Sequence, residues 1–317
     1  MRTLPPAFVC IPIGAAGGLT EGNLPAYLLA AKGTTDYICL DAGTVHDGLV
    51  AARRKGCFDD IMVAAGSTLT LEGTVLTRHI KAYLITHPYL DHIQGMVQAS
   101  PNDTPKPLLS LPGVIEDIEK HLFNWRLWPN FGDRGVAPCL NLYRYHALAH
   151  GVTTPIAGTS LTVEALPLAH GPQTDSAAFL VQSAGQYALY MGDTGPDSVE
   201  GRATTQRLWK RIAPLIREGR LHGIFIETSY PDGRADEQLF SHLTSSWLMR
   251  VFRQLAELVS PSSPAAALTG LNVIIVHIKP DLSTGATPAE RVRAELTAAN
   301  DLGLSLRFAA QGVRFDL

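Results

Sequence analysis

The sequence predicts an α/β protein in which two β-sheets are flanked by helices. Short apolar segments rich in Val, Ile, Leu and Tyr recur along the chain, which is typical of buried strands. Segments with helical periodicity separate some of them, and at four places a strand is followed at once by His or Asp and then by a turn. Because a sheet holds the ends of its strands along a common edge, we expect these polar residues to gather there.

Length and composition allow one large domain or two modest ones, and because the Ser-Pro-rich run at 260–264 is interpreted as a loop, we expect a single domain over residues 1–317. The chain has 317 residues, of which 46% are hydrophobic, enough for a sizeable core. A net charge of −3 gives no electrostatic footprint for nucleic acid or for an anionic membrane surface. No apolar run reaches the roughly 18–20 residues of a membrane span. We therefore expect neither nucleic acid nor a membrane as a partner.

The beginning of the sequence and the cysteines bear on the compartment. The start MRTLPPAFVC lacks the basic region and long apolar core of a secretory signal. We therefore expect a cytoplasmic protein, or a periplasmic one if a signal peptide has been removed. The four cysteines are scattered without a Cys-x-x-Cys pair, and buried free thiols are their expected state.

The first part of the chain is expected to form three strands and a helix. The strands cover Phe8–Ile13, Ala26–Ala31 and Tyr37–Leu40, and the helix covers Leu49–Lys55. The glycine-rich loop at 14–18 lacks the GxGxxG spacing and the Lys-Ser/Thr pair of phosphate-binding loops, so we interpret it as a tight turn. Asp41 follows the third strand, and we interpret it as a carboxylate of the turn that supports the site without binding metal directly.

The strand expected over Arg78–Thr86 leads into a turn that is rich in metal-ligand side chains. The turn reads His87-Pro88-Tyr89-Leu90-Asp91-His92. Pro88 ends the strand because proline has no N–H to donate to a neighbouring strand. Imidazole and carboxylate groups on a rigid turn are the ligands that a zinc-type cation needs. The turn therefore predicts a metal site.

The segment from 102 to 150 combines a loop, a helix and many aromatic residues. A Pro-rich loop is expected over Asn102–Pro107 and a helix over Val114–Trp128. The helix is indicated by apolar residues three or four positions apart, namely Ile115, Ile118, Leu122 and Trp125. The aromatic residues continue to Phe131, and a hydrophobic cluster accounts for most of them.

The second half is expected to contain four strands that each deliver one chemically active residue. These are Ser160–Pro167 before His170, Gln186–Met191 before Asp193, Leu221–Ile226 before Glu227, and Asn272–Val276 before His277. Helices are expected over Leu239–Leu258, opening near His242, and over Pro288–Ala299. The strands Ser305–Phe308 and Gly312–Phe315 close the chain.

The turn that begins at His87 carries a specific resemblance. It is similar to the His-x-His-x-Asp-His motif of the metallo-β-lactamase superfamily, with Tyr89 in place of the second histidine. The run from His87 to Pro101 also resembles the signature of class II cyclic-nucleotide phosphodiesterases. It has leucine before the Asp-His pair, an apolar residue and a glycine soon after it, and Ser-Pro at the end. The resemblance implies an αββα sandwich of metallo-β-lactamase type over nearly the whole chain, with an active-site cap within residues 102–150.

The same resemblance implies two divalent metal ions, with zinc expected and manganese or iron as alternatives. One ion would be held by His87, Tyr89, His170 and Asp193, and the other by Asp91, His92, Asp193 and His277. Asp193 would bridge the two ions. Glu227 and His242 resemble the Glu and His-x-Thr pair of phosphodiesterases with this fold, in which the carboxylate orients an imidazole that donates a proton. The alternative for His242 is that it is an ordinary histidine at the start of a helix. Asp91 is expected to take part in catalysis as well as to bind metal.

Tyr89 departs from the motif and leaves three alternatives open. A neutral phenol has a pKa near 10 and is a poor ligand, although a metal lowers that value. Tyr89 is therefore either a tyrosinate ligand, or a residue beside a first site that holds its metal loosely, or the sign of a single-metal enzyme. We favour the loosely held metal.

Four residues are expected to contact substrate. By resemblance to the Phe-Asn…Trp-Pro segment of class II phosphodiesterases, Trp125 and Trp128 would cap the site and stack on a purine. Thr244 would position phosphate or cap a helix. Lys279, beside the last metal ligand, would hold phosphate or would be a solvated lysine.

The predicted function is metal-dependent hydrolysis of 3′,5′-cyclic nucleotides, cAMP or cGMP, to 5′-monophosphates. A phosphodiesterase of the tRNA 3′-processing type is one alternative, which the lack of a basic surplus disfavours. The other alternative is a non-catalytic nucleotide-binding protein whose metal site is weakened at Tyr89. The expected partner is a small cyclic nucleotide, and a homodimer is left open.

Overall fold

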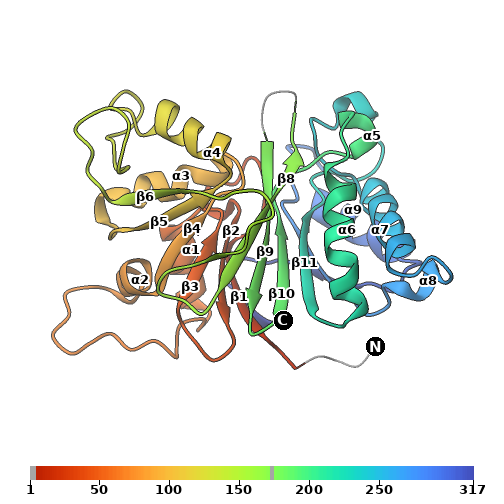
Figure 1. The fold of residues 1–317 in the computed structure, drawn as a ribbon, viewed down its shortest axis with the longest axis horizontal. Helices are drawn as coiled ribbons and strands as arrows, with labels where there is room; N and C mark the ends of the chain where they lie inside the picture. The colour runs from red at the N-terminus through yellow and green to blue at the C-terminus, as the bar shows by residue number, and fades with distance from the viewer. Residues whose placement is uncertain (1–4, 172–174) are drawn as a thin grey trace.

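The computed structural model describes residues 5–171 and 175–317. Within these residues, two mixed sheets of seven strands each pack face to face, and helices cover their outer sides (Figure 1). The predicted αββα arrangement is therefore confirmed.

The first sheet has the strand order β14-β1-β2-β3-β4-β5-β6. Its strands are β1 (Phe8–Gly14), β2 (Ala26–Ala31), β3 (Tyr37–Leu40), β4 (Ile80–Leu84), β5 (Lys106–Ser110), β6 (Tyr143–Ala147) and β14 (Phe315–Asp316). Strands β1 to β3 pair antiparallel, whereas β3 to β6 run parallel. Because β3 and β4 are parallel, with Leu40 opposite Leu84, they end at the same edge of the sheet.

The second sheet has the order β13-β12-β11-β10-β9-β8-β7. Its strands are β7 (Thr154–Pro155), β8 (Thr162–Ala169), β9 (Asp175–Ser183), β10 (Gln186–Met191), β11 (Leu221–Glu227), β12 (Asn272–Val276) and β13 (Ser305–Phe308). Strands β10 to β13 are parallel, and both β8 and β10 are antiparallel to β9. The carboxyl ends of β8, β10, β11 and β12 therefore share one edge.

Two groups of helices cover the sandwich, α1 to α4 beside the first sheet and α6 to α9 beside the second (Figure 1). The α-helices are α1 (His46–Arg54), α2 (Leu71–Thr74), α3 (Leu90–Ala99), α4 (Pro112–Asp117), α5 (Asp197–Glu200), α6 (Thr204–Arg217), α7 (Ser245–Val259), α8 (Pro264–Ala267) and α9 (Pro288–Ala299). Short 3-10 turns are η1 (Glu21–Asn23), η3 (Ser100–Asn102) and η5 (Asp236–Gln238), and π-helical turns are η2 (Val75–His79) and η4 (Ile118–Leu122).

The two faces of the second sheet pack against different partners. Its inner face meets the first sheet, where the Tyr27 ring lies 5.4 Å from that of Tyr190 and 5.8 Å from that of Phe225. Its outer face packs against α6 and α7, which bury apolar residues spaced three and four apart such as Trp209 and Phe252. Burial on both faces explains why its central strands read as continuous apolar runs.

Several predicted elements differ from the structure at their ends. Shifts of one to three residues separate the helix predicted over Leu49–Lys55 from α1 and the strand predicted over Ser160–Pro167 from β8. The strand predicted over Gly312–Phe315 was wrong except at its last residue, since β14 covers Phe315–Asp316.

Three further elements differ as follows. The helix predicted over Val114–Trp128 ends at Leu122, because the Asn124 side chain accepts hydrogen bonds from the N–H groups of Arg126 and Leu127 at 3.0 Å. The helix predicted over Leu239–Leu258 begins only at Ser245. The strand predicted over Arg78–Thr86 begins at Ile80, since the preceding residues are helical.

The segment from 102 to 150 contributes more regular structure than predicted. Lys106, expected in a loop, begins β5, and β6 follows as the edge strand of the first sheet. The active-site cap expected within this segment stays a prediction.

Among the described residues, every helix is too short or too polar to cross a membrane.

Candidate metal centre

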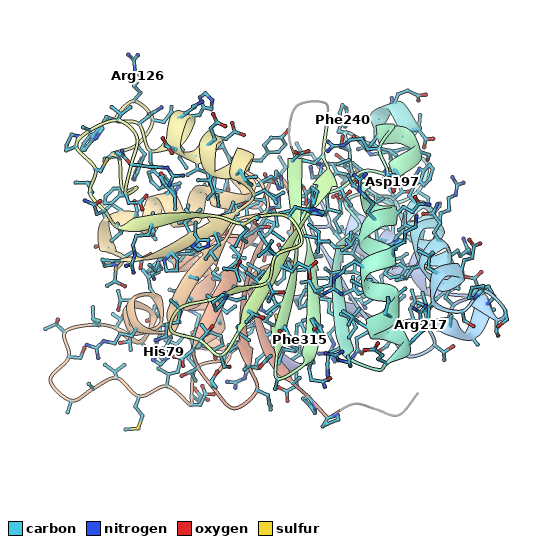
Figure 2. All side chains as sticks on the ribbon, viewed as in Figure 1. His79, Arg126, Asp197, Arg217, Phe240 and Phe315 are labelled. Atoms are coloured by element: carbon cyan, nitrogen blue, oxygen red, sulfur yellow. The ribbon has the colours of Figure 1, made fainter. Side chains whose placement is uncertain are left out.

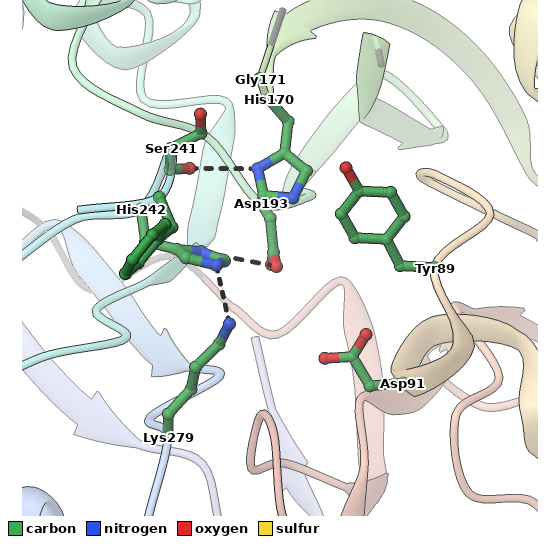
Figure 3. Close-up of a pocket in the computed structure, with 9 residues that line it drawn as sticks. Tyr89, Asp91, His170, Gly171, Asp193, Ser241, His242 and Lys279 are labelled. Atoms are coloured by element: carbon green, nitrogen blue, oxygen red, sulfur yellow. Dashed lines mark hydrogen bonds and ion pairs between the residues drawn. The ribbon is translucent and has the colours of Figure 1, made fainter. Parts of the chain in front are cut away.

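Side chains from both sheets meet in a cavity at the edge where the strands end. The cavity has a volume of about 280 Å³. It is lined by Tyr89, Asp91, His170, Gly171, Asp193, Phe240, Ser241, His242 and Lys279 (Figure 3). The common edge predicted from the strand pattern is therefore present, and it holds the residues that followed those strands.

Asp193 lies at the centre of this group. Its Oδ2 atom is 3.3 Å from His277 Nε2, 3.4 Å from His92 Nε2 and 4.0 Å from His87 Nε2. It is also 3.6 Å from His242 Nδ1. Residues that are distant in the sequence thus converge on one buried carboxylate.

Two sets of potential ligands share this carboxylate. On one side, the Nε2 atoms of His92 and His277 are 3.2 Å apart, and Asp91 Oδ2 is 3.3 Å from His277 Nε2. On the other side lie His87 and His170, whose ring centres are 4.7 Å apart. The Tyr89 ring lies against these two, 4.8 Å from the ring of His87 and 5.2 Å from that of His170. The division into two sets corresponds to the two sites expected from the sequence.

Hydrogen bonds at Nδ1 orient four of these histidines. His92 Nδ1 donates to Asp41 at 2.9 Å, and His87 Nδ1 to Thr86 Oγ1 at 2.9 Å. His277 Nδ1 donates to Ser229 Oγ at 2.9 Å, and His170 Nδ1 to the carbonyl of Ser241 at 3.1 Å. A histidine that donates from Nδ1 offers the lone pair of Nε2 to a metal. The four rings are thus fixed in the orientation that metal binding requires.

One of these Nε2 atoms is buried without a hydrogen-bond partner among the described residues, namely that of His87. An unpaired buried polar atom is costly, and an ion or a water molecule is a usual explanation. The combination of imidazole nitrogens and carboxylate oxygens is typical of zinc and of other first-row divalent cations. The residues present therefore fit two divalent metal ions around Asp193.

Burial and mutual charge set the pKa values of these groups. Burial holds the pKa of His87 well below its usual value, helped by the nearby His92, and burial also lowers the pKa of His170. Burial alone would raise the pKa of Asp193, but the charges of His277 and His92 outweigh it and lower that pKa. Burial opposes a charge on His92, yet Asp193 and Asp41 outweigh burial and raise its pKa. A metal cation among these groups would replace the positive charge that the proton on His92 supplies.

Asp41 supports the centre from behind, as expected from its position after β3. Its carboxylate accepts hydrogen bonds from the Thr86 N–H at 2.8 Å and the Tyr190 hydroxyl at 2.8 Å, besides the one from His92. Asp41 is fully buried and has a φ of +53°. A left-handed conformation is costly for a residue with a Cβ, and such positions concentrate at functional sites.

A second group of residues surrounds Glu227. Glu227 Oε1 accepts hydrogen bonds from His242 Nδ1 and from the Thr194 N–H, both at 2.9 Å. Its other oxygen accepts a hydrogen bond from the hydroxyl of Ser229, and this hydroxyl accepts a hydrogen bond from His277 Nδ1. Burial alone would raise the pKa of Glu227, but the adjacent His242 outweighs it and lowers that pKa. Glu227 is therefore held as a carboxylate that orients the His242 ring.

Lys279 is the remaining charged residue that lines the cavity beside His242. Its Nζ atom donates to His242 Nε2 at 2.7 Å, and Figure 3 shows the two side chains pointing toward each other. The ammonium group therefore lies in the cavity lining, next to the group expected to donate a proton.

Three residues expected to contact substrate lie outside the cavity lining. Trp128 donates from its indole to Ser100 Oγ at 3.0 Å and packs against the core. Trp125 is 44% exposed, and its indole donates to the carbonyl of Pro138. Thr244 accepts from the Trp247 N–H and so caps α7, which supports the alternative noted for it. Stacking by the two tryptophans and a phosphate contact from Thr244 stay predictions.

The glycine-rich loop after β1 is a turn that packs against the centre. A Cβ on Gly17 would lie 2.5 Å from the His277 ring, so the loop approaches this histidine as closely as only glycine allows. His277 itself has a φ of +57°, and its N–H donates to the carbonyl of Ala15 at 2.9 Å. The loop therefore helps to fix the position of His277.

Sequence reasoning missed Thr86, Ser229 and Tyr190, which hold the histidines and Asp41. Thr86 and Ser229 each lie beside a predicted site residue, and that proximity is the signal that could have found them. Tyr190 lies within a strand and carried no local signal.

Comparisons with known proteins relate this chain to the cyclic-nucleotide phosphodiesterases. Residues 7–312 match the family described as cAMP phosphodiesterases class-II. The 3′,5′-cyclic-nucleotide phosphodiesterase of Aliivibrio fischeri is 38% identical over 306 residues, which cover 96% of this chain and 92% of that protein.

Two solved structures show the same fold. The crystal structure of unliganded yeast PDE1 has a TM-score of 0.82 at 22% identity, covering 99% of this chain and 100% of that one. The metallo-β-lactamase fold protein YhfI from Bacillus subtilis has a TM-score of 0.60 at 14% identity, covering 97% of this chain and 99% of that one. The predicted metallo-β-lactamase type of sandwich is therefore confirmed.

Proposed function

We propose how this chain, which belongs to the class II cAMP phosphodiesterase family and is a 3′,5′-cyclic-nucleotide phosphodiesterase, carries out its reaction. Two divalent cations bind around Asp193, and His242 protonates the 3′ oxygen that leaves phosphorus. The substrate is cAMP, with cGMP as an alternative, and the product is the 5′-monophosphate.

The observation that carries this proposal is the position of Asp193 between two sets of oriented imidazoles. One cation is assigned to His87, His170 and Asp193, with Tyr89 beside it, and the other to Asp91, His92, Asp193 and His277. All of these residues were expected from the sequence. Among the described residues, groups of three potential ligand atoms lie within 4.8 Å of one another, and the groups are His87, His92 and Asp193; Asp91, His92 and His277; His170, Asp193 and His242; and Glu227, His242 and His277. Zinc is the cation proposed, with manganese or iron as alternatives.

Two divalent cations at such a centre lower the pKa of a water molecule and stabilise negative charge on the phosphoryl oxygens. Asp91 lines the cavity beside this centre, and we assign to its carboxylate the orientation of the attacking water. The Lys279 ammonium neutralises the phosphate as the substrate enters.

The leaving oxygen must gain a proton as its bond to phosphorus breaks. His242 holds one proton at Nδ1, directed at Glu227, and can carry a second at Nε2, which faces Lys279. A phosphate that enters the cavity offers Lys279 an anionic partner, so the ammonium moves from Nε2 to the phosphate. Once the ammonium has left, His242 Nε2 takes up a proton from solvent and donates it to the 3′ oxygen, while Glu227 stabilises the ring as long as it is charged.

The first test is metal removal. Dialysis against EDTA is expected to abolish cAMP hydrolysis, and added Zn²⁺ or Mn²⁺ is expected to restore it. Metal analysis of the same samples should show that turnover follows metal content. A chain that binds cAMP but does not hydrolyse it after metal addition would favour the non-catalytic nucleotide-binding alternative.

Tyr89 gives a second prediction. Tyr89→His supplies the imidazole usual at this position and is expected to raise the metal content from a ratio nearer one than two ions per chain toward two. The ring already lies against His87 and His170, so a histidine there would join the first set of ligands. Titration with Zn²⁺ by calorimetry, with the wild type as control, measures the change. Unaltered metal content and turnover would show that Tyr89 does not weaken this site.

Two further expectations stay predictions, the cytoplasmic location and the homodimer. The tRNA 3′-processing alternative is disfavoured by the family match, which spans residues 7–312.

A further inference from the structure

The direction of the reaction indicates where the nucleoside lies. Phosphoryl transfer proceeds with the attacking and leaving oxygens roughly in line through phosphorus. The attacking water belongs to the side of the metal ligands, so the 3′ oxygen and its ribose point away from that side. They point toward His242, the group assigned to protonate the leaving oxygen. This step depends on the proposed function.

Two aromatic side chains that line the cavity are substantially exposed, Tyr89 at 45% and Phe240 at 69%. Tyr89 packs against His87 and His170 and so belongs to the metal side. Phe240 is two residues before His242 and so belongs to the leaving-group side. Tyr230 lies near the same histidine, but a guanidinium group covers its ring, with Arg234 Cζ 3.8 Å from the ring centre. Phe240 therefore offers the available aromatic face on this side of the described cavity.

The backbone holds Phe240 in this exposed position. Leu239 before it is fully buried, and the His242 N–H closes a tight turn onto the Leu239 carbonyl at 3.1 Å. The carbonyl of Ser241 accepts a hydrogen bond from His170. Phe240 and Ser241 have φ values of +50° and +60°, a costly conformation for residues other than glycine. The side chain lies at the upper edge of the view in Figure 2.

A phenyl ring that is 69% exposed buries little apolar surface, so it adds little to the stability of the fold. Such a ring offers a flat apolar surface to a ligand, and aromatic rings bind nucleobases by stacking. We propose that Phe240 stacks on the nucleobase of the cyclic nucleotide and so sets a preference for purines, whose rings offer the larger surface. The base site assigned here differs from the Trp125 and Trp128 surface expected from the sequence.

The test compares substrates with and without a nucleobase. Phe240→Ala is expected to raise KM for cAMP about tenfold with little change in kcat, because loss of one stacked aromatic ring typically weakens base binding by about this factor or more. The preference for cAMP over cCMP should fall in this variant and return in Phe240→Trp. Hydrolysis of bis(p-nitrophenyl) phosphate, which has no nucleobase, should stay at the wild-type rate and show that the catalytic centre is intact.

Met62→Ala is the control, since this side chain is also apolar and exposed, at 89%, but lies outside the cavity lining. Its KM for cAMP is expected to stay at the wild-type value. A raised KM in Trp125→Ala together with an unchanged KM in Phe240→Ala would overturn the assignment in favour of the cap. A wild-type chain that hydrolyses bis(p-nitrophenyl) phosphate but no cyclic nucleotide would overturn the proposed function itself. If instead the wild type hydrolyses cAMP and Phe240→Ala has the same KM for it, only the stacking would be overturned.

Discussion

Asp193→Asn is expected to lower kcat/KM for cAMP by about a thousandfold or more and to lower the metal content of the purified protein. The carboxylate lies 3.3 to 3.4 Å from the Nε2 atoms of His277 and His92, and it faces His87 as well. A neutral amide has the same shape but lacks the negative charge with which Asp193 would hold the two proposed cations. Charge stabilisation by such cations amounts to several kcal/mol, and each ~1.4 kcal/mol is a factor of about ten in rate. Steady-state kinetics and metal analysis on the same preparation measure both effects.

Asp47→Asn is the matched control for this substitution. Asp47 is the second residue of α1, and its side chain is 75% exposed, so the same loss of charge should leave turnover and metal content unaltered. Circular dichroism establishes that both variants fold. If Asp193→Asn kept full metal content and most of its turnover, the carboxylate would not bridge two ions and the proposed centre would be wrong.

His242→Ala is expected to lower kcat for cAMP by about 10²–10⁴-fold, the range typical of general acids. The same variant should hydrolyse bis(p-nitrophenyl) phosphate within a few fold of the wild-type rate. The 3′ alkoxide is a strong base that must be protonated as it leaves, whereas p-nitrophenolate is a stable anion that leaves without a proton. The ratio of the two activities therefore measures the loss of the proton donor separately from any damage to the rest of the site.

Metal analysis completes this experiment, because His242 also lies near Asp193, His170 and His277. Metal content equal to that of the wild type is expected. A parallel loss of metal and of activity toward both substrates would instead make His242 a ligand. His121→Ala, at an exposed position of η4, serves as a control and should leave both activities unchanged.

Much of the fold could be predicted because local signals and tertiary structure agree. The strands Gln186–Met191 and Asn272–Val276 have the predicted bounds, since each is an apolar run between turn residues. The helix Pro288–Ala299 also has its predicted bounds, which follow from Thr287 and Glu290 forming a capping box. Helix α6 was missed although its apolar residues recur with helical spacing, and Pro214 within it conceals the pattern.

The start of helix α7 and the contacts that orient the site residues could not be predicted from the local sequence. The sequence near His242 looks helical, but Phe240 and Ser241 adopt a left-handed conformation imposed by contacts such as that from His170. The metal-ligand candidates could be predicted because they follow strands whose ends must meet. Their orientation could not, because it depends on Thr86, Ser229 and Asp41, whose hydrogen bonds join segments far apart in the chain.

Asp41 ties the two halves of the sandwich together at the catalytic centre. It directly follows β3 of the first sheet, accepts a hydrogen bond from the hydroxyl of Tyr190 on β10 of the second, and accepts another from His92 on α3. Because one buried carboxylate joins all three, separation of the sheets on heating would at once release an imidazole from its place. Heat inactivation of the enzyme should therefore coincide with its melting, with no temperature range in which a folded chain has lost its catalytic arrangement.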